Sequence, residues 1–127
     1  MSLRVLIVED EFFIALDLQD QVEEAGHVVT GVVRDIESCR RAAREKPPDI
    51  ALMDLRLADG SSGIDASRWL YEAMGVRCIF ISGNLDDETR RILADVEPIA
   101  FIGKPILGHQ LKRELDRFRD RLTRRIE

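Results

Sequence analysis

The sequence predicts an α/β fold, a single doubly wound five-stranded parallel sheet with five helices. Three observations predict it. The chain has 127 residues, about the size of one domain. Short apolar runs alternate with segments of helical periodicity along the whole length, which requires parallel strands with helices on both faces of the sheet. Polar residues follow four of the five runs, at the ends where parallel sheets bind ligands.

The composition is that of a soluble globular protein, with 45% hydrophobic and 34% charged residues. A net charge of −5 gives no overall attraction to nucleic acid or to an anionic membrane. No apolar run approaches the ~20 residues of a membrane helix, and Met1–Arg4 leaves no room for a signal peptide, so we expect a cytoplasmic protein. We interpret Cys39 and Cys78 as reduced thiols, and His27 and His109 as ordinary surface or element-end residues.

Aliphatic and β-branched runs in the first half of the chain predict three strands: Arg4–Val8, His27–Val33 and Ile50–Met53. A helix between the first two ends at Gly26 and has one apolar face: Ile14, Leu18, Val22 and Ala25. Asp35 can cap a second helix that runs through Arg44, and Pro47–Pro48 prevent it from continuing.

The second half of the chain continues the alternation. Residues 58–63 have loop composition, and the helix that follows them ends at Gly75 and is marked by three apolar positions: Ala66, Leu70 and Met74. Two more strands are predicted on either side of a charged helix over residues 86–95: Val76–Ile81 and Ile99–Ile102. The last helix carries a long apolar stripe: Leu107, Leu111, Leu115, Phe118, Leu122 and Ile126.

The polar residues at the strand ends predict one shared site: Glu9, Asp10, Asp54, Ser82 and Lys104. Each of them taken alone also fits a helix cap, a turn or a solvated lysine. Together, three nearby carboxylates repel one another by ~4 kcal/mol per pair at 4 Å and an effective dielectric constant of 20, so they favour a bound cation. Oxygen ligands suit Mg²⁺, and a carboxylate beside that ion can attack phosphorus to form an acyl phosphate.

Four stretches occur in the order that is typical of one protein family: Val8–Glu11, Leu52–Leu55, Ile81–Gly83 and Gly103–Pro105. In these motifs the chain resembles a response-regulator receiver domain of two-component signalling, a family with the flavodoxin-like fold. The resemblance covers about residues 3–118. The stretch from Asp54 to Gly60 is further similar to receivers that are common in alphaproteobacteria, which implies a bacterial protein.

The resemblance implies a phosphoacceptor and a magnesium site. Asp54 corresponds to the phosphorylated aspartate and Asp10 to a direct Mg²⁺ ligand. Glu9 would bind the ion through water, and the main-chain carbonyl of Arg56 would complete the protein ligands.

The resemblance also implies a phosphoryl-binding pair and a switch. Lys104 would pair with the phosphoryl group and precede a cis Pro105. Ser82 would bind a phosphoryl oxygen and move with it, while the ring of Phe101 turns inward; the alternative for Phe101 is an ordinary core side chain. The usual output surface of the family joins the fourth helix, the fifth strand and the fifth helix.

Three functions compete. The first is a phospho-switch, not an enzyme, that accepts a phosphoryl group from a sensor histidine kinase or a histidine phosphotransfer protein and then binds a downstream protein target. The second is an aspartyl-phosphate phosphatase on a similar fold, which would need Asp-x-Asp where this chain has Asp54-Leu55-Arg56. The third is a pseudo-receiver or adaptor that binds partners without phosphorylation. Nucleotide binding is disfavoured because no glycine-rich phosphate motif follows the first strand.

Two departures from the family pattern lead to further expectations. Arg56 is large and cationic, so we expect it to slow the loss of phosphate. The chain is expected to form one domain over residues 1–127, with its last helix extended over about 119–127. That helix ends without a stop signal, which leaves open a stand-alone receiver or a piece of a longer protein.

The extended helix also suggests self-association. Leu122 and Ile126 are expected to lie beyond the end of the domain and to be buried against a second copy or a further C-terminal segment. Residues 109–127 hold seven Lys or Arg and four acids, an excess of 7 − 4 = +3. Because acids interleave with the cations and Phe118 is the only aromatic residue there, we expect no direct contact with nucleic acid.

Overall fold

Five parallel strands form one sheet in the order β2-β1-β3-β4-β5. The structure, a computed structural model, describes residues 1–60 and 62–126. The strands are β1 (Arg4–Val8), β2 (Val28–Val33), β3 (Ile50–Asp54), β4 (Arg77–Ser82) and β5 (Ala100–Gly103). The helices are α1 (Phe12–Glu24), α2 (Ile36–Glu45), α3 (Gly63–Met74), α4 (Asp87–Ile92) and α5 (Gln110–Ile126). The predicted fold class is therefore confirmed.

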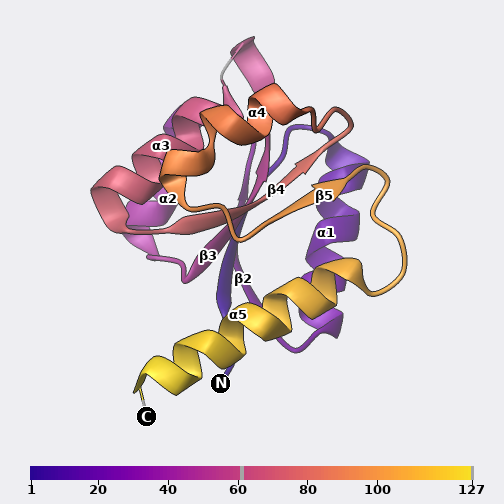
Figure 1. Ribbon diagram of the computed structural model, residues 1–127, viewed down its shortest axis with the longest axis vertical. Coiled ribbons are helices and arrows are strands. Elements are labelled where there is room, and N and C mark those ends of the chain that lie inside the picture. The colour runs from indigo at the N-terminus through magenta and orange to yellow at the C-terminus, as the bar shows by residue number, and fades with distance from the viewer. Residues whose placement is uncertain (61, 127) are drawn as a thin grey trace.

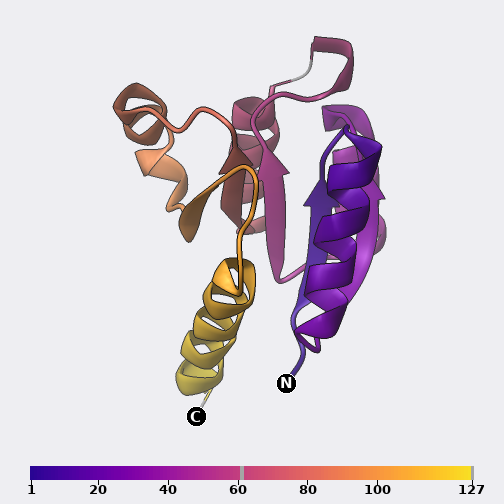
Figure 2. The ribbon, with the colours of Figure 1, turned by 90° about the vertical axis from the view of Figure 1, so that its right-hand side faces the viewer.

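The helices cover both faces of the sheet, as Figures 1 and 2 show. On one face, α1 and α5 pack against alternate strand residues such as Ile7 and Ile79, and we call this the α1/α5 core. On the other face, α2 and α3 pack against Leu6 and Phe80, and we call this the α2/α3 core. The central strand β3 is buried at every position, because helices cover both of its faces.

The predicted helix over residues 86–95 is shorter in the structure. Helix α4 ends at Ile92, and a 3-10 turn, Ala94–Val96, follows it. Leu93 and Val96 are buried in the α2/α3 core, so the chain has to turn at this point to place both of them inside. Charge periodicity alone could not reveal this turn.

The apolar stripe of the last helix is also shorter than predicted. Leu107 lies in the loop before α5 and is 71% exposed. Leu111, Leu115 and Phe118 are buried in the α1/α5 core as expected. Leu122 packs partly against the same core, so the expectation that it lies beyond the domain was wrong. The side chain of Ile126 lies outside the residues whose side chains the structure describes.

His27 stands at the end of an element, as one of the two sequence-based interpretations had it, but the alternative of a surface residue was wrong. It immediately precedes β2 and is only 4% exposed. The backbone N–H of Leu3 donates to its Nδ1 over 3.0 Å, and its Nε2 lies 3.1 Å from Oδ1 of Asp116 on α5. Because Nδ1 accepts a hydrogen bond, the proton of the neutral ring is on Nε2 and is donated to Asp116. His27 therefore joins the start of β1 to α5.

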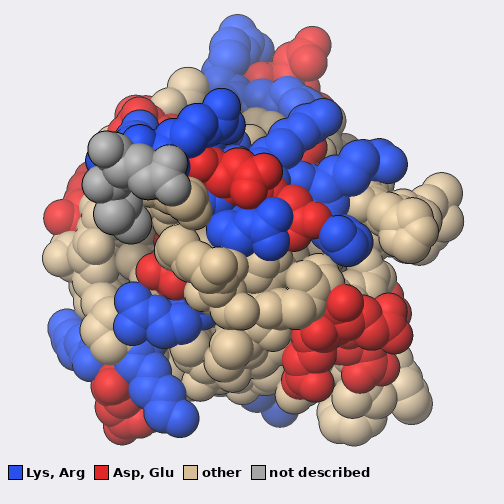
Figure 3. Space-filling model, turned by 90° about the horizontal axis from the view of Figure 1, so that it is seen from below, with Lys and Arg blue, Asp and Glu red and all other residues tan. Residues whose placement is uncertain are grey.

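The charges of α5 are largely paired. Lys112 and Arg119 both contact Asp116, and Arg117 contacts Glu114. Figure 3 shows positive and negative side chains interleaved over much of the lower end of the molecule. No described helix is both long enough and apolar enough to cross a membrane.

Candidate functional site

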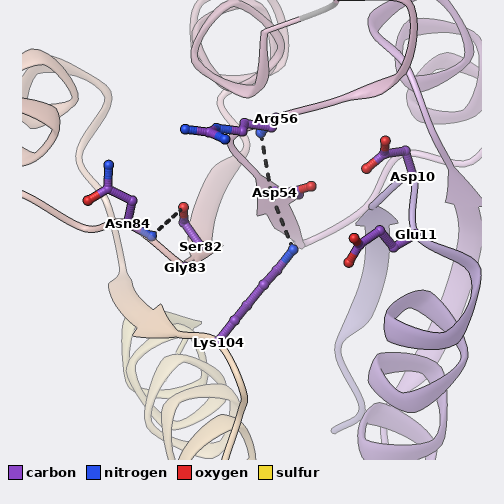
Figure 4. A pocket seen from close by; sticks show the side chains of 8 residues that line it. All are labelled: Asp10, Glu11, Asp54, Arg56, Ser82, Gly83, Asn84 and Lys104. Atoms are coloured by element: carbon purple, nitrogen blue, oxygen red, sulfur yellow. Dashed lines mark hydrogen bonds and ion pairs between the residues drawn. The ribbon is translucent and has the colours of Figure 1, made fainter.

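The carboxyl ends of the strands meet at a cavity of about 380 Å³ (Figure 4). Asp10, Asp54, Ser82 and Lys104, four of the predicted site residues, line it together with Arg56. Glu9, the remaining predicted ligand, is 3% exposed and is not among the lining residues, but it contacts Lys104, which is. Glu11, Gly83 and Asn84 also line the cavity; the sequence analysis gave them no role of their own because they lie in motif or turn positions.

The position of Asp54 depends on a close approach between β3 and the start of α3. The backbone N–H of Gly63 donates to the carbonyl of Leu55 over 3.1 Å. A Cβ atom on Gly63 would overlap the carbonyl oxygen of Asp54 and would lie 2.7 Å from the Cα of Leu55. Residue 63 must therefore be glycine if Asp54 is to stay where it is. Sequence reasoning placed this glycine only in a loop and missed its role.

Lys104 connects two of the carboxylates. Its Nζ lies 2.9 Å from Oε1 of Glu9 and 3.4 Å from Oδ1 of Asp54. Oδ1 of Asp54 also accepts a hydrogen bond of 3.3 Å from the backbone N–H of Arg56, while the other oxygen points toward Asp10 (Figure 4). One oxygen of Asp54 is thus held by donors and the other faces the acidic side of the cavity.

The electrostatics of the site follow from burial and crowding. Burial raises the pKa of Glu9 to about 7, and the neighbouring Asp54 adds to the shift while Lys104 opposes it. Burial alone would lower the pKa of Lys104, but the contact with Glu9 and the charge of Asp54 outweigh it and raise that pKa. The site therefore keeps Lys104 charged and holds Glu9 close to its titration point near neutral pH.

The residues present fit a bound divalent cation. Glu9, Asp10 and Asp54 each offer one carboxylate oxygen, and these atoms lie within 4.8 Å of one another. Oε1 of Glu9 is buried, and its close contact in the described part of the chain is the ion pair of 2.9 Å with Nζ of Lys104. Mg²⁺ is coordinated by oxygen atoms, directly or through water, and these carboxylate oxygens are available as ligands.

The raised pKa of Glu9 makes the stability of the metal-free chain depend on pH. Its ordinary pKa is 4.5, so between about pH 4.5 and 7 the unfolded chain has released a proton that the folded chain still holds. The free energy of unfolding therefore falls as pH rises through this range, by about 1–3 kcal/mol from this group. Urea denaturation in EDTA at pH 5, 6, 7 and 8 measures it. In Glu9→Gln the free energy of unfolding should lack this fall with pH. The prediction is contradicted if the free energy of unfolding changes with pH by the same amount in both proteins.

Ser82 and Phe101 lie on the neighbouring strands β4 and β5, and of the two only Ser82 lines the cavity. Ser82 is 8% exposed, and its Oγ accepts a hydrogen bond of 3.2 Å from the backbone N–H of Asn84, which leaves its own proton to donate. Phe101 is half-buried and stacks on the ring of Phe80, with centroids 5.5 Å apart. Arg56 is exposed at the mouth of the cavity, and its guanidinium points away from Asp10 (Figure 4). The peptide bond before Pro105 is cis, as the resemblance implied.

Known proteins share this sequence pattern and fold. The family model for the response regulator receiver domain matches residues 5–116. The phyllosphere-induced regulator PhyR of Methylorubrum extorquens is 46% identical over 83 residues, which are 65% of this chain and 31% of PhyR. The matches cover 31% of PhyR, 50% of the transcriptional regulatory protein CitB of Klebsiella pneumoniae and 49% of the transcriptional regulatory protein PdtaR of Mycobacterium tuberculosis, so this chain spans half or less of these relatives.

Two solved structures extend the comparison. The signal receiver domain of a modulated diguanylate cyclase from Desulfovibrio desulfuricans superimposes with a TM-score of 0.86 and 31% identity, over 95% of this chain and 96% of that one. The response regulator PhyR from Brucella abortus superimposes with a TM-score of 0.80 and 30% identity, over 98% of this chain and 51% of that one.

Proposed function

This chain belongs to the response regulator receiver domain family, and we propose that Asp54 accepts a phosphoryl group from a histidine kinase or a histidine phosphotransfer protein, with Mg²⁺, to switch binding to a downstream protein. The observation that carries the proposal is the position of the Asp54 carboxylate. One oxygen is held by Lys104 and the backbone of Arg56, and the other opens into the cavity beside Asp10. The domain acts only on its own phosphate and is not an enzyme in the usual sense.

The proposed reaction is an in-line displacement at phosphorus. The oxygen of Asp54 that faces the cavity attacks the phosphorus of a phosphohistidine, the P–N bond breaks, and its electron pair stays on the imidazole nitrogen. The product is an acyl phosphate on Asp54 and a free histidine on the donor. Water reverses the switch by attacking the same phosphorus and releasing the carboxylate.

The surrounding residues stabilise the charge that develops on the phosphoryl oxygens. Lys104 supplies a fixed positive charge, and the hydroxyl of Ser82 donates a hydrogen bond once it moves toward Asp54. Mg²⁺ held by Glu9, Asp10, Asp54 and the carbonyl of Arg56 would neutralise further charge on those oxygens. Ser82 and Phe101 would form the switch that carries this change to the output surface.

An exposed apolar surface beside the cavity supports docking of the phosphodonor there. Phe12, Phe13 and Leu107 are 71%, 81% and 71% exposed. Next to them lies an apolar cavity of about 410 Å³ that shares Lys104 with the acidic cavity and includes Pro105. Contiguous exposed apolar side chains mark protein interaction sites, and this one would bring a histidine next to Asp54.

The proposed function is tested by incubation with Mg²⁺ and a small phosphodonor such as acetyl phosphate, followed by intact mass measurement. We expect one added phosphoryl group, absent in Asp54→Ala. An unmodified parent chain would favour the pseudo-receiver alternative. Sustained turnover of other phosphate esters without a stable form on Asp54 would favour the phosphatase alternative.

Binding of Mg²⁺ should stabilise the folded chain. A ligand that binds only the folded state adds about 2.7 kcal/mol at a hundredfold excess over Kd. Asp10→Asn removes one of the three repelling carboxylates, so it should raise the stability without metal and abolish the effect of Mg²⁺. Thermal melting of both proteins, with EDTA and with Mg²⁺, measures this. A parent Tm that Mg²⁺ leaves unchanged would contradict the prediction.

Arg56 should lengthen the life of the phosphorylated state. It lies at the mouth of the cavity, where its charge can pair with phosphoryl oxygens or obstruct the attacking water. We expect Arg56→Asn to lose phosphate about threefold to tenfold faster, as the loss of one exposed charge contact of about 1 kcal/mol predicts. Arg91→Asn, an exposed site on α4, is the matched control. The prediction fails if Arg56→Asn loses phosphate at the parent rate or more slowly.

Other expectations about partners remain predictions. Self-association through α5 now depends on Ile126, because Leu122 packs within its own chain. Cytoplasmic location and the lack of direct contact with nucleic acid also remain predictions. Because the chain spans only part of its curated relatives, the output activities of those longer proteins are not assigned to it.

A further inference from the structure

The ring of Phe101 contacts both a core aromatic ring and a cation. It stacks on the fully buried Phe80, with 20° between the ring planes. The guanidinium carbon of Arg90, on α4, lies 4.7 Å from the centroid of the same ring. A cation at this distance is attracted to the negative face of an aromatic ring.

Helix α4 makes few other contacts with the rest of the domain. None of its residues is buried, and Ile92 at its end is 46% exposed. Arg68 of α3 donates to the carbonyl of Ile92 over 3.4 Å, and the buried Leu93 follows directly. The contact between Arg90 and Phe101 therefore joins the body of α4, which has no buried residue, to strand β5.

There is also open space on this face of the sheet into which the ring of Phe101 could move away from Arg90. Phe101 pairs with Phe80 across the two strands, and Gly103 pairs with Ser82 two residues further on. Side chains two residues apart share a face of the sheet, so all four positions lie on the side of α4. A Cβ atom on Gly103 would meet nothing within 4 Å, so the position that pairs with Ser82 on this face leaves open space.

We propose that Arg90 is a positioning residue that holds Phe101, and with it α4, in the resting arrangement, so that the contact opposes the phosphorylated state. This inference rests on the proposed function. If phosphorylation of Asp54 draws Ser82 toward the phosphate, the ring moves into the open space and its contact with Arg90 is broken. A contact made in only one of two states shifts the equilibrium by its full strength.

The test uses 3-fluorophenylalanine, which places a fluorine-19 reporter on each of the five Phe residues. The signal of residue 101 is assigned with Phe101→Leu. The variants are Arg90→Gln, Arg90→Lys, which keeps the cation, and Arg91→Gln, which removes the same charge from the next residue of α4. Each is titrated with beryllofluoride, a mimic of the phosphoryl group, at fixed Mg²⁺.

Two results are expected. Without beryllofluoride, Arg90→Gln should move the Phe101 signal and Arg91→Gln should leave it in place. The beryllofluoride concentration for half-saturation should fall about twofold to fivefold in Arg90→Gln, the factor that corresponds to an exposed cation–π contact. Arg90→Lys should recover most of the parent value, which a purely structural role would not require.

The outcomes separate the two proposals. A parent that responds to beryllofluoride while Arg90→Gln behaves like Arg91→Gln overturns the role of Arg90 alone. A parent whose Phe101 signal does not respond, and whose Asp54 takes up no phosphate, overturns the proposed function and this inference with it.

Discussion

Alanine in place of Gly63 should lower the free energy of unfolding by about 3 kcal/mol, near the upper end of overpacking effects. The added Cβ would overlap the carbonyl oxygen of Asp54, which is backbone and cannot rotate away. Relief requires α3 to move away from β3, and that movement displaces Asp54, the proposed phosphoacceptor. We therefore also expect phosphorylation of Asp54 to slow more than tenfold in the fraction that still folds.

Urea denaturation and the phosphorylation rate measure the two effects of Gly63→Ala. Gly83→Ala is the matched control, since a Cβ there meets nothing within 4 Å although the residue lines the same cavity. If both variants unfold at the same urea concentration as the parent, then the close approach at Gly63 does not constrain the fold.

His27→Ala should cost about 2–4 kcal/mol of folding stability. The backbone N–H of Leu3 would stay buried without an acceptor, which costs about 1–3 kcal/mol. Asp116 would lose a donor, and removing a ring that is 4% exposed would leave a cavity between β1 and α5. The proposed metal site, Glu9, Asp10 and Asp54, lies at the opposite end of the strands, so any affinity of the folded fraction for Mg²⁺ should stay unchanged.

Chemical denaturation of His27→Ala and of the control His109→Ala checks this prediction. His109 is exposed in the turn before α5, so its variant should stay within about 0.5 kcal/mol of the parent. Equal losses in the two variants would show that the contacts of His27 with Leu3 and Asp116 contribute little to the fold.

Pattern alone predicted the sheet and most of the site, for a physical reason. Strands buried on both faces, such as β3 with its run Ile50–Met53, must be largely apolar, and the first polar residue after each run lies at the same edge of a parallel sheet. Asp54 and Lys104 could therefore be placed together although fifty residues separate them. Once the strand ends lie side by side, the opposite charges of Lys104 and Asp54 come into contact.

The features that pattern could not predict depend on contacts between distant segments. The burial of His27 requires Leu3 on one side and Asp116 on the other, and no local periodicity reports either. The end of α4 is decided by the α2/α3 core, which takes in Leu93 and Val96. Gly63 looked like a loop residue because its constraint comes from the backbone of Asp54 and not from its neighbours in sequence.

Lys104 contacts Glu9 although the two residues lie far apart in the sequence, since Glu9 follows the first strand and Lys104 follows the last. The two groups can meet only after every strand between them has joined the sheet. A nascent or partly unfolded chain would have Asp54 but not the cation beside it. Only completely folded copies would then accept a phosphoryl group, and unfolded copies would not take phosphoryl groups from the donor.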